Sequence, residues 1–287
     1  MEIVLGKTAG FCYGVRNAVQ KAEEKLKKHK NVSCLGELVH NGQVIRKLEK
    51  LGLKIVERVE DSNNKVIIRA HGIAKEIYYK AKKLDIEIFD FTCPNVLKIH
   101  KIADEHASKG YYIFLIGGKN HPESLGTISF CGKDSYLIET KEEIDEAIKA
   151  FKDSNIKKLL IIVQTTFSLE KFNSYVRQIK EKIDDDVELQ VKNTICNATK
   201  IRQEETCEIS KRVQCMIIIG GRNSSNTKKL YDIAKENCEN TMIVETKDEL
   251  DAKAIKQFEK IGIMAGASTP DDSIEGVIET IHSYQSV

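Results

Sequence analysis

Short apolar runs rich in β-branched residues alternate along the chain with charged, amphipathic segments. The run LLIIV at 159–163 is typical of the apolar stretches and has the length of a strand. The segment NAVQKAEEKLKKHK at 17–30 is typical of the charged stretches and predicts a helix. Segments that alternate in this way predict strand–helix–strand units around mostly parallel sheets. The pattern therefore predicts an α/β fold.

The chain also contains an internal repeat. The stretch IGGKNHPES at 116–124 returns as IGGRNSSNT at 219–227, and the first glycines of the two copies are 103 residues apart. Three further pairs share this offset: Cys93 with Cys196, His121 with Ser224, and Thr165 with Ser268. An ungapped offset that four landmarks share indicates a duplicated structural unit.

A third copy lies upstream, at an offset of 81 residues. This offset relates Cys12 to Cys93, Gly36 to Gly117, and His40 to His121. In each copy a helix follows the cysteine, and 24 residues after the cysteine a glycine opens a strand-to-helix turn. We therefore expect three pseudo-threefold-related α/β domains, at residues 13–93, 94–192 and 193–287, around a central site.

Polar turns follow the apolar strands of all three copies. Because ligands of open α/β sheets lie at the carboxyl ends of the strands, we expect these turns to face one crevice. Their side chains are neutral or weakly basic and lie near helix N-termini, where backbone N–H groups favour anions. A phosphate or diphosphate fits such a lining. The candidate binding residues are His40, His71, His121, Thr165, Thr166, Ser224, Ser225, Asn226 and Ser268.

Eight cysteines without any C-x-x-C pair argue against a zinc ribbon or a thioredoxin-type redox site. Cys12, Cys93 and Cys196 recur at equivalent positions and predict three thiolates on a pseudo-threefold axis. Three thiolates on a [4Fe–4S] cluster leave one iron open to substrate. Zinc and buried structural thiols are the alternatives at this point. The five cysteines that do not recur are interpreted as core or inert surface thiols: Cys34, Cys131, Cys207, Cys215 and Cys238.

Glu123 breaks the repeat, because the offsets align it with Asn226 and Gly42. A carboxylate at an otherwise neutral anion site is costly unless it has a role, and proton delivery is one such role. The alternative is a glutamate at the start of a helix, stabilised by the helix dipole. Histidines outside the repeated turns are interpreted as structural: His29, His100, His106 and His282.

Charge and hydropathy argue against a nucleic-acid partner and against a membrane span. The 45 Lys and Arg residues nearly balance the 43 Asp and Glu residues, for a net charge of +2, so we expect no nucleic-acid partner. The apolar runs are far shorter than the roughly 18 residues that a membrane span needs. The first residues, MEIVLGKTAG, do not have the pattern of a signal peptide, and we expect a cytoplasmic protein.

Nine short motifs follow one another between residues 10 and 274. They are GFCYGV, ELVHNGQV, RAHGI, FTCPNVLKIH, GGKNHPESLGT, QTTFS, TICNATKIRQEE, GGRNSSNT and AGASTPDDSI. Together they resemble the 4-hydroxy-3-methylbut-2-enyl diphosphate reductase family, the last enzymes of the non-mevalonate isoprenoid pathway. A set of this kind, in order over nearly the whole chain, is highly specific, whereas any single motif is weak.

The resemblance implies one [4Fe–4S] cluster per chain, held by Cys12, Cys93 and Cys196. It implies that Glu123 donates protons and that the candidate binding residues hold the substrate, mostly by its diphosphate. The threonine that approaches the substrate hydroxyl is Thr165 or Thr166, and the repeat offset favours Thr165. The resemblance also implies that an N-terminal strand, within residues 1–12, joins the third domain.

The reaction that the resemblance implies is reductive dehydroxylation to isopentenyl diphosphate and dimethylallyl diphosphate. By this hypothesis the open iron binds the allylic hydroxyl, electrons arrive one at a time, and Glu123 supplies the proton that lets water leave. No P-loop or dinucleotide-binding fingerprint is present, so we expect an external donor such as ferredoxin or flavodoxin. A zinc hydrolase of diphosphate esters and a non-catalytic iron–sulfur sensor are the competing hypotheses.

Overall fold

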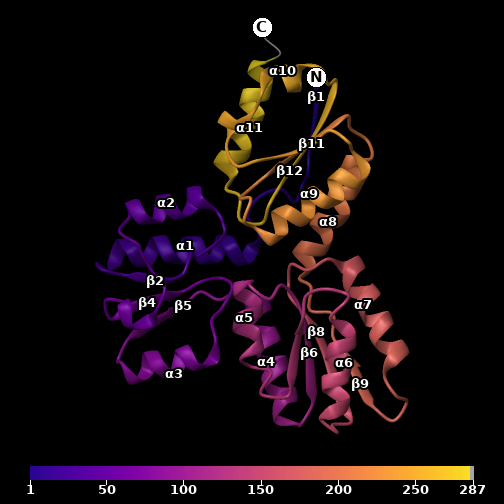
Figure 1. Ribbon diagram of the computed structural model, residues 1–287. Helices are drawn as coiled ribbons and strands as arrows, with labels where there is room; N and C mark the ends of the chain where they lie inside the picture. Colours follow the sequence, from indigo (N-terminus) through magenta and orange to yellow (C-terminus); the bar gives the residue numbers. More distant parts are fainter. Residues whose placement is uncertain (285–287) are drawn as a thin grey trace. The chain divides into compact units, whose positions relative to one another are not determined.

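The computed structural model describes residues 1–284, which form three four-stranded parallel sheets with helices packed on them (Figure 1). The first sheet along the chain contains β2 (Ser33–Leu35), β3 (Lys54–Val56), β4 (Lys65–Ile68) and β5 (Glu87–Asp90). The second contains β6 (Tyr112–Ile116), β7 (Ser135–Ile138), β8 (Lys158–Val163) and β9 (Glu188–Val191). The third contains β1 (Glu2–Leu5), β10 (Cys215–Ile219), β11 (Thr241–Val244) and β12 (Lys260–Ala265).

Helices occupy most of the connections between strands. The α-helices are α1 (Tyr13–Lys28), α2 (Gly42–Lys50), α3 (Lys75–Lys83), α4 (Pro94–Ser108), α5 (Pro122–Ile128), α6 (Ile144–Asp153), α7 (Leu169–Lys182), α8 (Asn197–Ser210), α9 (Ser225–Asn237), α10 (Ala252–Lys256) and α11 (Asp271–Ser283). Two short 3-10 turns, η1 (Val59–Asp61) and η2 (Lys247–Glu249), complete the described elements. None of the helices in residues 1–284 is both long and apolar enough to cross a membrane.

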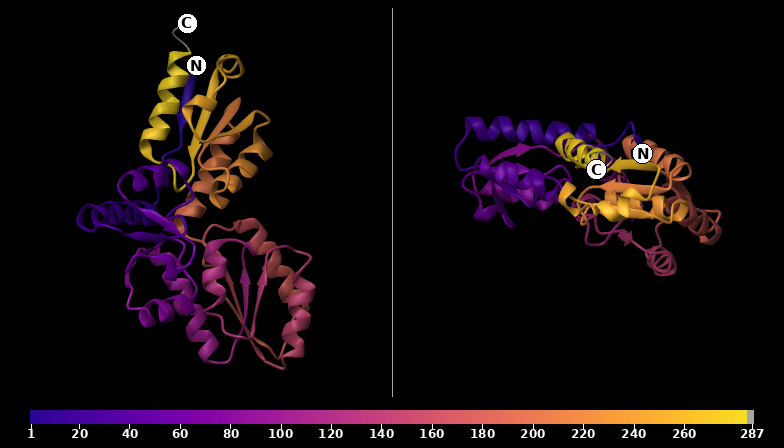
Figure 2. Two further views of the ribbon diagram at one scale, coloured as in Figure 1. Left: turned by 60° about the vertical axis from the view of Figure 1, so that its left-hand side comes forward. Right: turned by 90° about the horizontal axis from the view of Figure 1, so that it is seen from above.

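The three sheets share one strand order. From edge to edge the orders are β3-β2-β4-β5, β7-β6-β8-β9 and β11-β10-β12-β1. The last place in the third sheet is taken by β1, which pairs in parallel with β12 and sets Leu5 opposite Ile263. Figure 2 shows the indigo N-terminal strand beside the yellow and orange C-terminal part of the chain. The first strand of the chain therefore completes the last sheet. The expectation of an α/β fold with parallel sheets is confirmed.

The chain folds as two compact units. Unit 1 comprises residues 1–16 and 39–47 and the chain from Asn197 onward, and it contains the sheet of β1, β10, β11 and β12. Unit 2 comprises residues 17–38 and 48–196 and contains the other two sheets. The domain boundaries expected from the repeat, 13–93, 94–192 and 193–287, stay a prediction.

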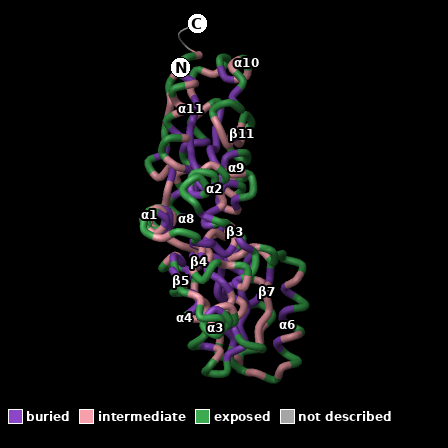
Figure 3. Tube along the Cα trace, turned by 90° about the vertical axis from the view of Figure 1, so that its left-hand side faces the viewer, coloured by how far each residue is buried: buried purple, intermediate pink, exposed green. Residues whose placement is uncertain are grey.

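Helices cover both faces of the β6–β9 sheet in unit 2. On one face, Phe151 of α6 and Phe172 of α7 pack in one cluster with Phe114 of the central strand β6. On the other face, Ile99 of α4 packs with Ile113. Alternate residues of β6 and β8 belong to these two clusters, as expected for a covered parallel sheet. Figure 3 colours the chain by burial and shows the buried residues mainly inside the layers. The apolar area removed from water is the main source of stability for this layer.

Unit 1 repeats this layered packing. Val277 of α11 packs with Ile217 on one face of the sheet, in a cluster that also includes Ile255 of α10. Leu230 of α9 packs with Met216 on the other face. Alternate residues of β10 therefore serve two separate cores, which explains why the strand is apolar without interruption.

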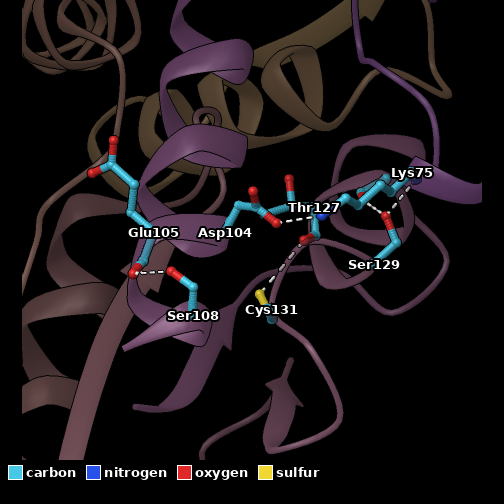
Figure 4. A network of polar contacts seen from close by, with 8 residues as sticks. Lys75, Asp104, Glu105, Ser108, Thr127, Ser129 and Cys131 are labelled. Carbon is cyan, nitrogen blue, oxygen red and sulfur yellow. Dashed lines mark hydrogen bonds and ion pairs between the residues drawn. The ribbon is translucent and has the colours of Figure 1, made fainter. Parts of the chain in front are cut away.

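A polar network in unit 2 fastens the start of α3 to α4 and α5 (Figure 4). The backbone N–H of Lys75 donates to Ser129 Oγ at 2.8 Å, and the Lys75 Nζ lies 2.5 Å from Asp104 Oδ1. A Cβ atom on Gly126 would lie 3.4 Å from the backbone of Ile73, so the two segments approach closely. The loop that precedes α3 is therefore held against the helix that carries Glu123.

The structure confirms part of the repeat and corrects part of it. The glycine that follows the first strand of each copy donates its N–H to the end of the neighbouring strand; these glycines are Gly36, Gly117 and Gly220, with acceptors Val56, Ile138 and Val244. The expected pairing of Thr165 with Ser268 is wrong by one residue. Ile116 pairs with Val163, whereas Ile219 pairs with Ala265, so Ser268 corresponds to Thr166.

A second correction concerns the residues that cap the helices after these glycines. A side chain accepts a hydrogen bond from the first turn of each helix, and the capping residues are Asn41 for α2, His121 for α5 and Ser224 for α9. His40 therefore precedes its cap by one residue and does not match His121. By the same alignment Glu123 corresponds to Gln43, and the expected match with Gly42 is wrong.

Gly262 of β12 provides a test of the packing in unit 1. A Cβ atom at this position would lie 2.3 Å from Met216 Sδ and 2.7 Å from Ile209 Cγ2, where no side chain fits without displacement. We expect Gly262→Ala to lower the free energy of unfolding by about 1–3 kcal/mol, measured by urea denaturation followed by circular dichroism.

The matched control for this substitution is Gly276→Ala on α11. The nearest atom to a Cβ there is Lys247 Cδ at 3.4 Å, on a flexible side chain. Alanine at this position is expected to raise the free energy of unfolding by about 0.5–1 kcal/mol. Equal effects of the two substitutions would contradict the packing described for β12.

Candidate functional site

The three repeated cysteines occupy the same place relative to their sheets. Cys12 follows β1, Cys93 follows β5 and Cys196 follows β9, and each immediately precedes a helix. Each cysteine N–H donates to a carbonyl in the loop after the neighbouring strand; the acceptors are Ala267, Ala70 and Thr165, at 3.1, 3.0 and 3.1 Å. The same backbone hydrogen bond therefore fixes each cysteine next to one polar turn of its own sheet.

The residues after these three acceptors are also equivalent. They are Ser268, His71 and Thr166, all of them candidate binding residues. Each belongs to a turn that is closed by a backbone hydrogen bond over three residues. The carbonyl of the residue before the acceptor receives this bond, as when Gly72 N–H donates to Arg69 and Phe167 N–H donates to Gln164. The sheets thus present one cysteine and one polar side chain at corresponding positions.

Burial separates the repeated three cysteines from four of the other five. All eight lie within the described residues, and no disulfide joins any of them. Cys12, Cys93 and Cys196 are partly exposed. Burial raises the pKa of the thiols of Cys34, Cys131 and Cys215 to about 12, which keeps them protonated at neutral pH. Cys238 is also buried, and Cys207 is partly exposed on α8.

The three partly exposed thiols fit an iron–sulfur cluster in the type of ligand that they offer. Thiolates are the usual ligands of such clusters, and the N-terminus of a helix after each cysteine favours a negative charge. Cys12 belongs to unit 1, and Cys93 and Cys196 belong to unit 2. Within residues 1–284, no group of three His, Cys, Asp or Glu side chains is assembled as a metal site. The shared use of the three thiols remains a prediction.

Glu123 lies in the first turn of α5, and its carboxylate is turned into the protein. The side chain is buried, with 2% of its surface exposed. Its carboxylate accepts hydrogen bonds from the backbone N–H of Thr165 at 2.6 Å and from the hydroxyl of Thr165 at 2.7 Å. The carboxylate therefore has specific partners inside the protein in addition to the helix N-terminus.

The environment of Glu123 sets its protonation. Burial raises the pKa of the Glu123 carboxyl to about 7, and the two hydrogen bonds from Thr165 oppose this shift by stabilising the charged form. Burial is the larger effect. In a substantial fraction of the molecules the Glu123 carboxyl therefore carries a proton at neutral pH, which is the condition for a general acid.

His121 lies next to Glu123 in unit 2, and His71 lies next to His121. His121 Nδ1 accepts the backbone N–H of Glu123 at 3.2 Å and caps α5. The His71 ring lies edge-on to the His121 ring, with 5.7 Å between the ring centroids. The structure therefore brings together His71, His121, Glu123 and Thr165 from three different loops.

Gln164 is a further residue of this group, and the sequence reasoning did not single it out. Its Oε1 accepts the N–H of Gly118 at 3.0 Å and lies 3.3 Å from Ser124 Oγ. Its Nε2 donates to the hydroxyl of Thr166 at 2.8 Å. Gln164 thus links the turn after β6 to the turn after β8. Its place in the quoted motif QTTFS was the only available signal.

The candidate binding residues of unit 1 form a second group, around the N-terminus of α9. Ser224 caps this helix, its Oγ accepting the N–H of Thr227 at 3.3 Å, and Ser225 and Asn226 begin the first turn. Ser268 donates its hydroxyl proton to the backbone carbonyl of His40 at 3.0 Å. These residues come from three separate loops of unit 1.

The turns of this group are close enough to exclude side chains between them. A Cβ atom on Gly221 would lie 3.0 Å from the carbonyl oxygen of His40. A Cβ atom on Gly220, whose φ is +151°, would lie 2.7 Å from Thr227 Oγ1. The glycines of GGRNSSNT therefore let the backbone of His40 approach the start of α9.

Asn226 carries a buried polar side chain in this group. The residue is buried, with 4% exposed, and neither its Oδ1 nor its Nδ2 has a hydrogen-bond partner within the described part of the chain. A buried amide without partners costs free energy, so such a group needs an explanation. A phosphate oxygen accepting from Nδ2 at the helix N-terminus would supply the partner.

Of the ten non-cysteine candidates, five lie in unit 2 and five in unit 1. The first five are His71, His121, Glu123, Thr165 and Thr166, and the second five are His40, Ser224, Ser225, Asn226 and Ser268.

The histidines outside the repeated turns are interpreted as structural, and the contacts of two of them support this interpretation. His106 lies against Gln190 and the carbonyl of Ile102, and His100 stacks on Phe130.

Comparison with known proteins places the whole chain in one family. Residues 3–282 match the family model described as LytB protein. The chain is 40% identical over 281 residues to the 4-hydroxy-3-methylbut-2-enyl diphosphate reductase of Clostridioides difficile, covering 97% of this chain and 98% of the relative. It is also 40% identical over 282 residues to the enzyme of that name from Aquifex aeolicus, with 96% and 94% covered.

Solved structures agree with these relatives. One is a structure of (E)-4-hydroxy-3-methyl-but-2-enyl diphosphate reductase, described as the terminal enzyme of the non-mevalonate pathway, with 39% identity and a TM-score of 0.71. It covers 99% of this chain and 100% of that one. Another is the reductase from Plasmodium falciparum, with 32% identity, a TM-score of 0.89, and 97% and 87% covered. The chain therefore belongs to the LytB family of diphosphate reductases.

Proposed function

We propose that the chain reduces 4-hydroxy-3-methylbut-2-enyl diphosphate to isopentenyl diphosphate and dimethylallyl diphosphate, as the last step of the non-mevalonate pathway. The reaction breaks the allylic C–O bond, forms one C–H bond and releases water, and it consumes two electrons and two protons. The names of the relatives support this substrate. The observation that carries the proposal is a buried, protonatable Glu123 beside the hydroxyl of Thr165.

The proposed cofactor is one [4Fe–4S] cluster with the thiolates of Cys12, Cys93 and Cys196 as its ligands. Bound there, the cluster would supply the two electrons one at a time and a Lewis-acidic iron for the hydroxyl. The electrons come from an external one-electron carrier of the ferredoxin or flavodoxin type. Support for this assignment comes from the equivalent hydrogen bonds that hold the three cysteine amides, and from their partial exposure.

The residues of unit 1 are proposed to hold the diphosphate. Ser224, Ser225 and Asn226 lie at the N-terminus of α9, where N–H groups and the helix dipole attract phosphate oxygens. Ser268 and His40 extend this lining from two further loops. Several hydrogen bonds to one end of the substrate would restrict its motion, and orientation of this kind contributes to rate enhancement.

The residues of unit 2 are proposed to act on the hydroxyl end. The proton that Glu123 holds near neutral pH would pass to the leaving hydroxyl group, with Thr165 keeping the carboxyl group in place. His121 fixes the first turn of α5 through the Glu123 amide, and His71 lies against its ring. Thr166 is held by Gln164 beside them. Burial of the carboxyl excludes water from the proton transfer.

We expect Glu123→Gln to lower kcat by about 100-fold or more, because glutamine can accept the Thr165 N–H and donate to the Thr165 hydroxyl but has no acidic proton to give. In the wild-type protein kcat should fall as pH rises through about 7, where the carboxyl loses its proton. The measurement is substrate-dependent oxidation of a reduced viologen. Glu105→Gln, an exposed carboxylate on α4, serves as the control. Wild-type turnover in Glu123→Gln would remove Glu123 from the mechanism.

Asn226→Leu is expected to separate binding from stability. Loss of the amide should raise KM by about tenfold or more, as for loss of a hydrogen bond to a charged group. The melting temperature should stay the same or rise, since the substitution removes buried polar atoms that have no partners. Asn237→Leu, at the exposed end of α9, is the control for a change of the same size. An unchanged KM would argue against a phosphate at this helix.

Metal and sulfide analysis of anaerobically purified protein tests the cofactor. We expect about four iron and four sulfide per chain. Cys12→Ala, Cys93→Ala and Cys196→Ala should each lose most of the iron, whereas Cys34→Ala and Cys131→Ala should retain it because these two thiols are buried and protonated. A colourless protein that contains zinc and no sulfide would instead support the hydrolase hypothesis.

A further inference from the structure

The loop that carries Cys12 differs from the loops that carry the other two repeated cysteines. Cys12 lies seven residues beyond Leu5, the end of β1, whereas Cys93 lies three beyond Asp90 and Cys196 five beyond Val191. A longer loop has more conformations to lose, so it needs more contacts to hold its end in one place. The hydrogen bond from the Cys12 amide to Ala267 is shared with the other copies and does not meet this extra need.

Arg202 of α8 supplies the additional contacts. Its Nε and Nη2 donate to the carbonyl of Thr8 at 2.8 and 2.5 Å, and Nη2 also donates to the carbonyl of Gly10 at 2.8 Å. Gly10 has a φ of +96°, a conformation that suits glycine. Only 3% of Arg202 is exposed. A buried guanidinium that donates to two loop carbonyls fixes their positions because its donors are planar and rigid.

Glu205, one turn further along α8, holds the other side of the same loop. Its carboxylate accepts the N–H groups of Lys7 and Thr8 at 2.6 and 2.9 Å, and the Thr8 hydroxyl at 2.5 Å. Burial acts to raise the pKa of Glu205, but the hydrogen bonds from Thr8 hold it below its ordinary value, so the side chain is ionised. The backbone N–H groups of the loop are therefore bound by Glu205 and its backbone carbonyls by Arg202, and both side chains come from α8.

We propose that Arg202 is a positioning residue that sets the place of Cys12 through the carbonyls of Thr8 and Gly10. The motif TICNATKIRQEE contains both Cys196 and Arg202. The helix that begins directly after the proposed ligand Cys196 therefore carries the arginine that holds the loop of the proposed ligand Cys12. This inference rests on the proposed function, because Cys12 matters as a ligand only if a cluster is bound. Glu205 assists by fixing the N–H groups of the loop.

Amide hydrogen exchange of the full-length, metal-free protein tests the loop directly. Lysine keeps the charge of Arg202 but cannot bond both carbonyls with fixed geometry. In Arg202→Lys, exchange at the Cys12 amide should be at least about tenfold faster than in the wild type, since a local opening exposes that amide. Exchange at the Cys93 amide, bonded to Ala70 in unit 2, should be unchanged.

The wild-type protein and Arg202→Lys, both loaded with iron and sulfide, test whether the position of the Cys12 loop affects how firmly the cluster is held. We expect anaerobic Arg202→Lys to lose iron to a chelator several-fold faster than the wild type and to show an altered EPR signal in the reduced state. Arg212→Lys is the matched control, because Arg212 is an exposed arginine whose Nε donates to the carbonyl of Glu208 one turn earlier and to no carbonyl of the Cys12 loop. It should behave as the wild type in both measurements.

The outcomes separate positioning from general stability. Unchanged exchange at Cys12 overturns the proposal. Equal acceleration at Cys12 and Cys93 also overturns it, since Arg202 would then stabilise the whole fold rather than one loop. Faster exchange at Cys12 alone, together with faster loss of iron, supports it. If the wild-type protein binds no iron and sulfide, the proposed function fails, and the exchange measurement alone still decides whether Arg202 fixes the loop.

Discussion

The arrangement of the candidate site depends on one hydrogen bond that occurs three times, from a cysteine amide to the carbonyl of a polar turn. In each sheet the bond joins the end of an edge strand to the loop after its inner neighbour. Parallel pairing places both strand ends at the same edge of the sheet, so the bond needs no long connection. Once it forms, the residue after the acceptor, which is His71, Thr166 or Ser268, lies beside the cysteine segment. The proposed cluster ligands and the proposed substrate-binding residues are therefore connected by a backbone hydrogen bond in each sheet.

The side chains on this repeated framework are different in each copy, and the proposed substrate is asymmetric as well. Unit 2 places a carboxyl group, Glu123, where unit 1 has the neutral Asn226. One group would give a proton, and the other would donate a hydrogen bond to an anion. A strictly symmetric site would put a carboxylate next to the diphosphate and repel it. The repeat therefore places side chains at equivalent positions, and the residues that differ between the copies, such as Glu123 and Asn226, would give these positions different chemical roles.

Much of this organisation could be predicted from the sequence, because strand and helix patterns and the spacing of Cys, Gly and polar turns are local features. The α/β class and the equivalent glycines followed from them. The errors were of one residue, at Ser268 and His40, since an offset counts residues and does not show where a loop has changed length. Gln164 and Arg202 were not found because their role lies in contacts to distant loops. The pKa of Glu123 depends on burial, which no spacing reveals.

The raised pKa of Glu123 has a cost in stability, which the packing around it must offset. A shift of the pKa from 4.5 to about 7 means that the ionised carboxylate is less favourable in the fold than in water by about 3 kcal/mol. This cost is absent below pH 4.5, grows as pH rises, and is complete above about 7. More hydrogen bonds to the carboxylate would remove the cost, but they would also lower the pKa and leave no proton to donate. Two donors from Thr165 hold the group in place without reversing the effect of burial. The apolar layers on both faces of the β6–β9 sheet keep α5 and the β8 turn together against this cost.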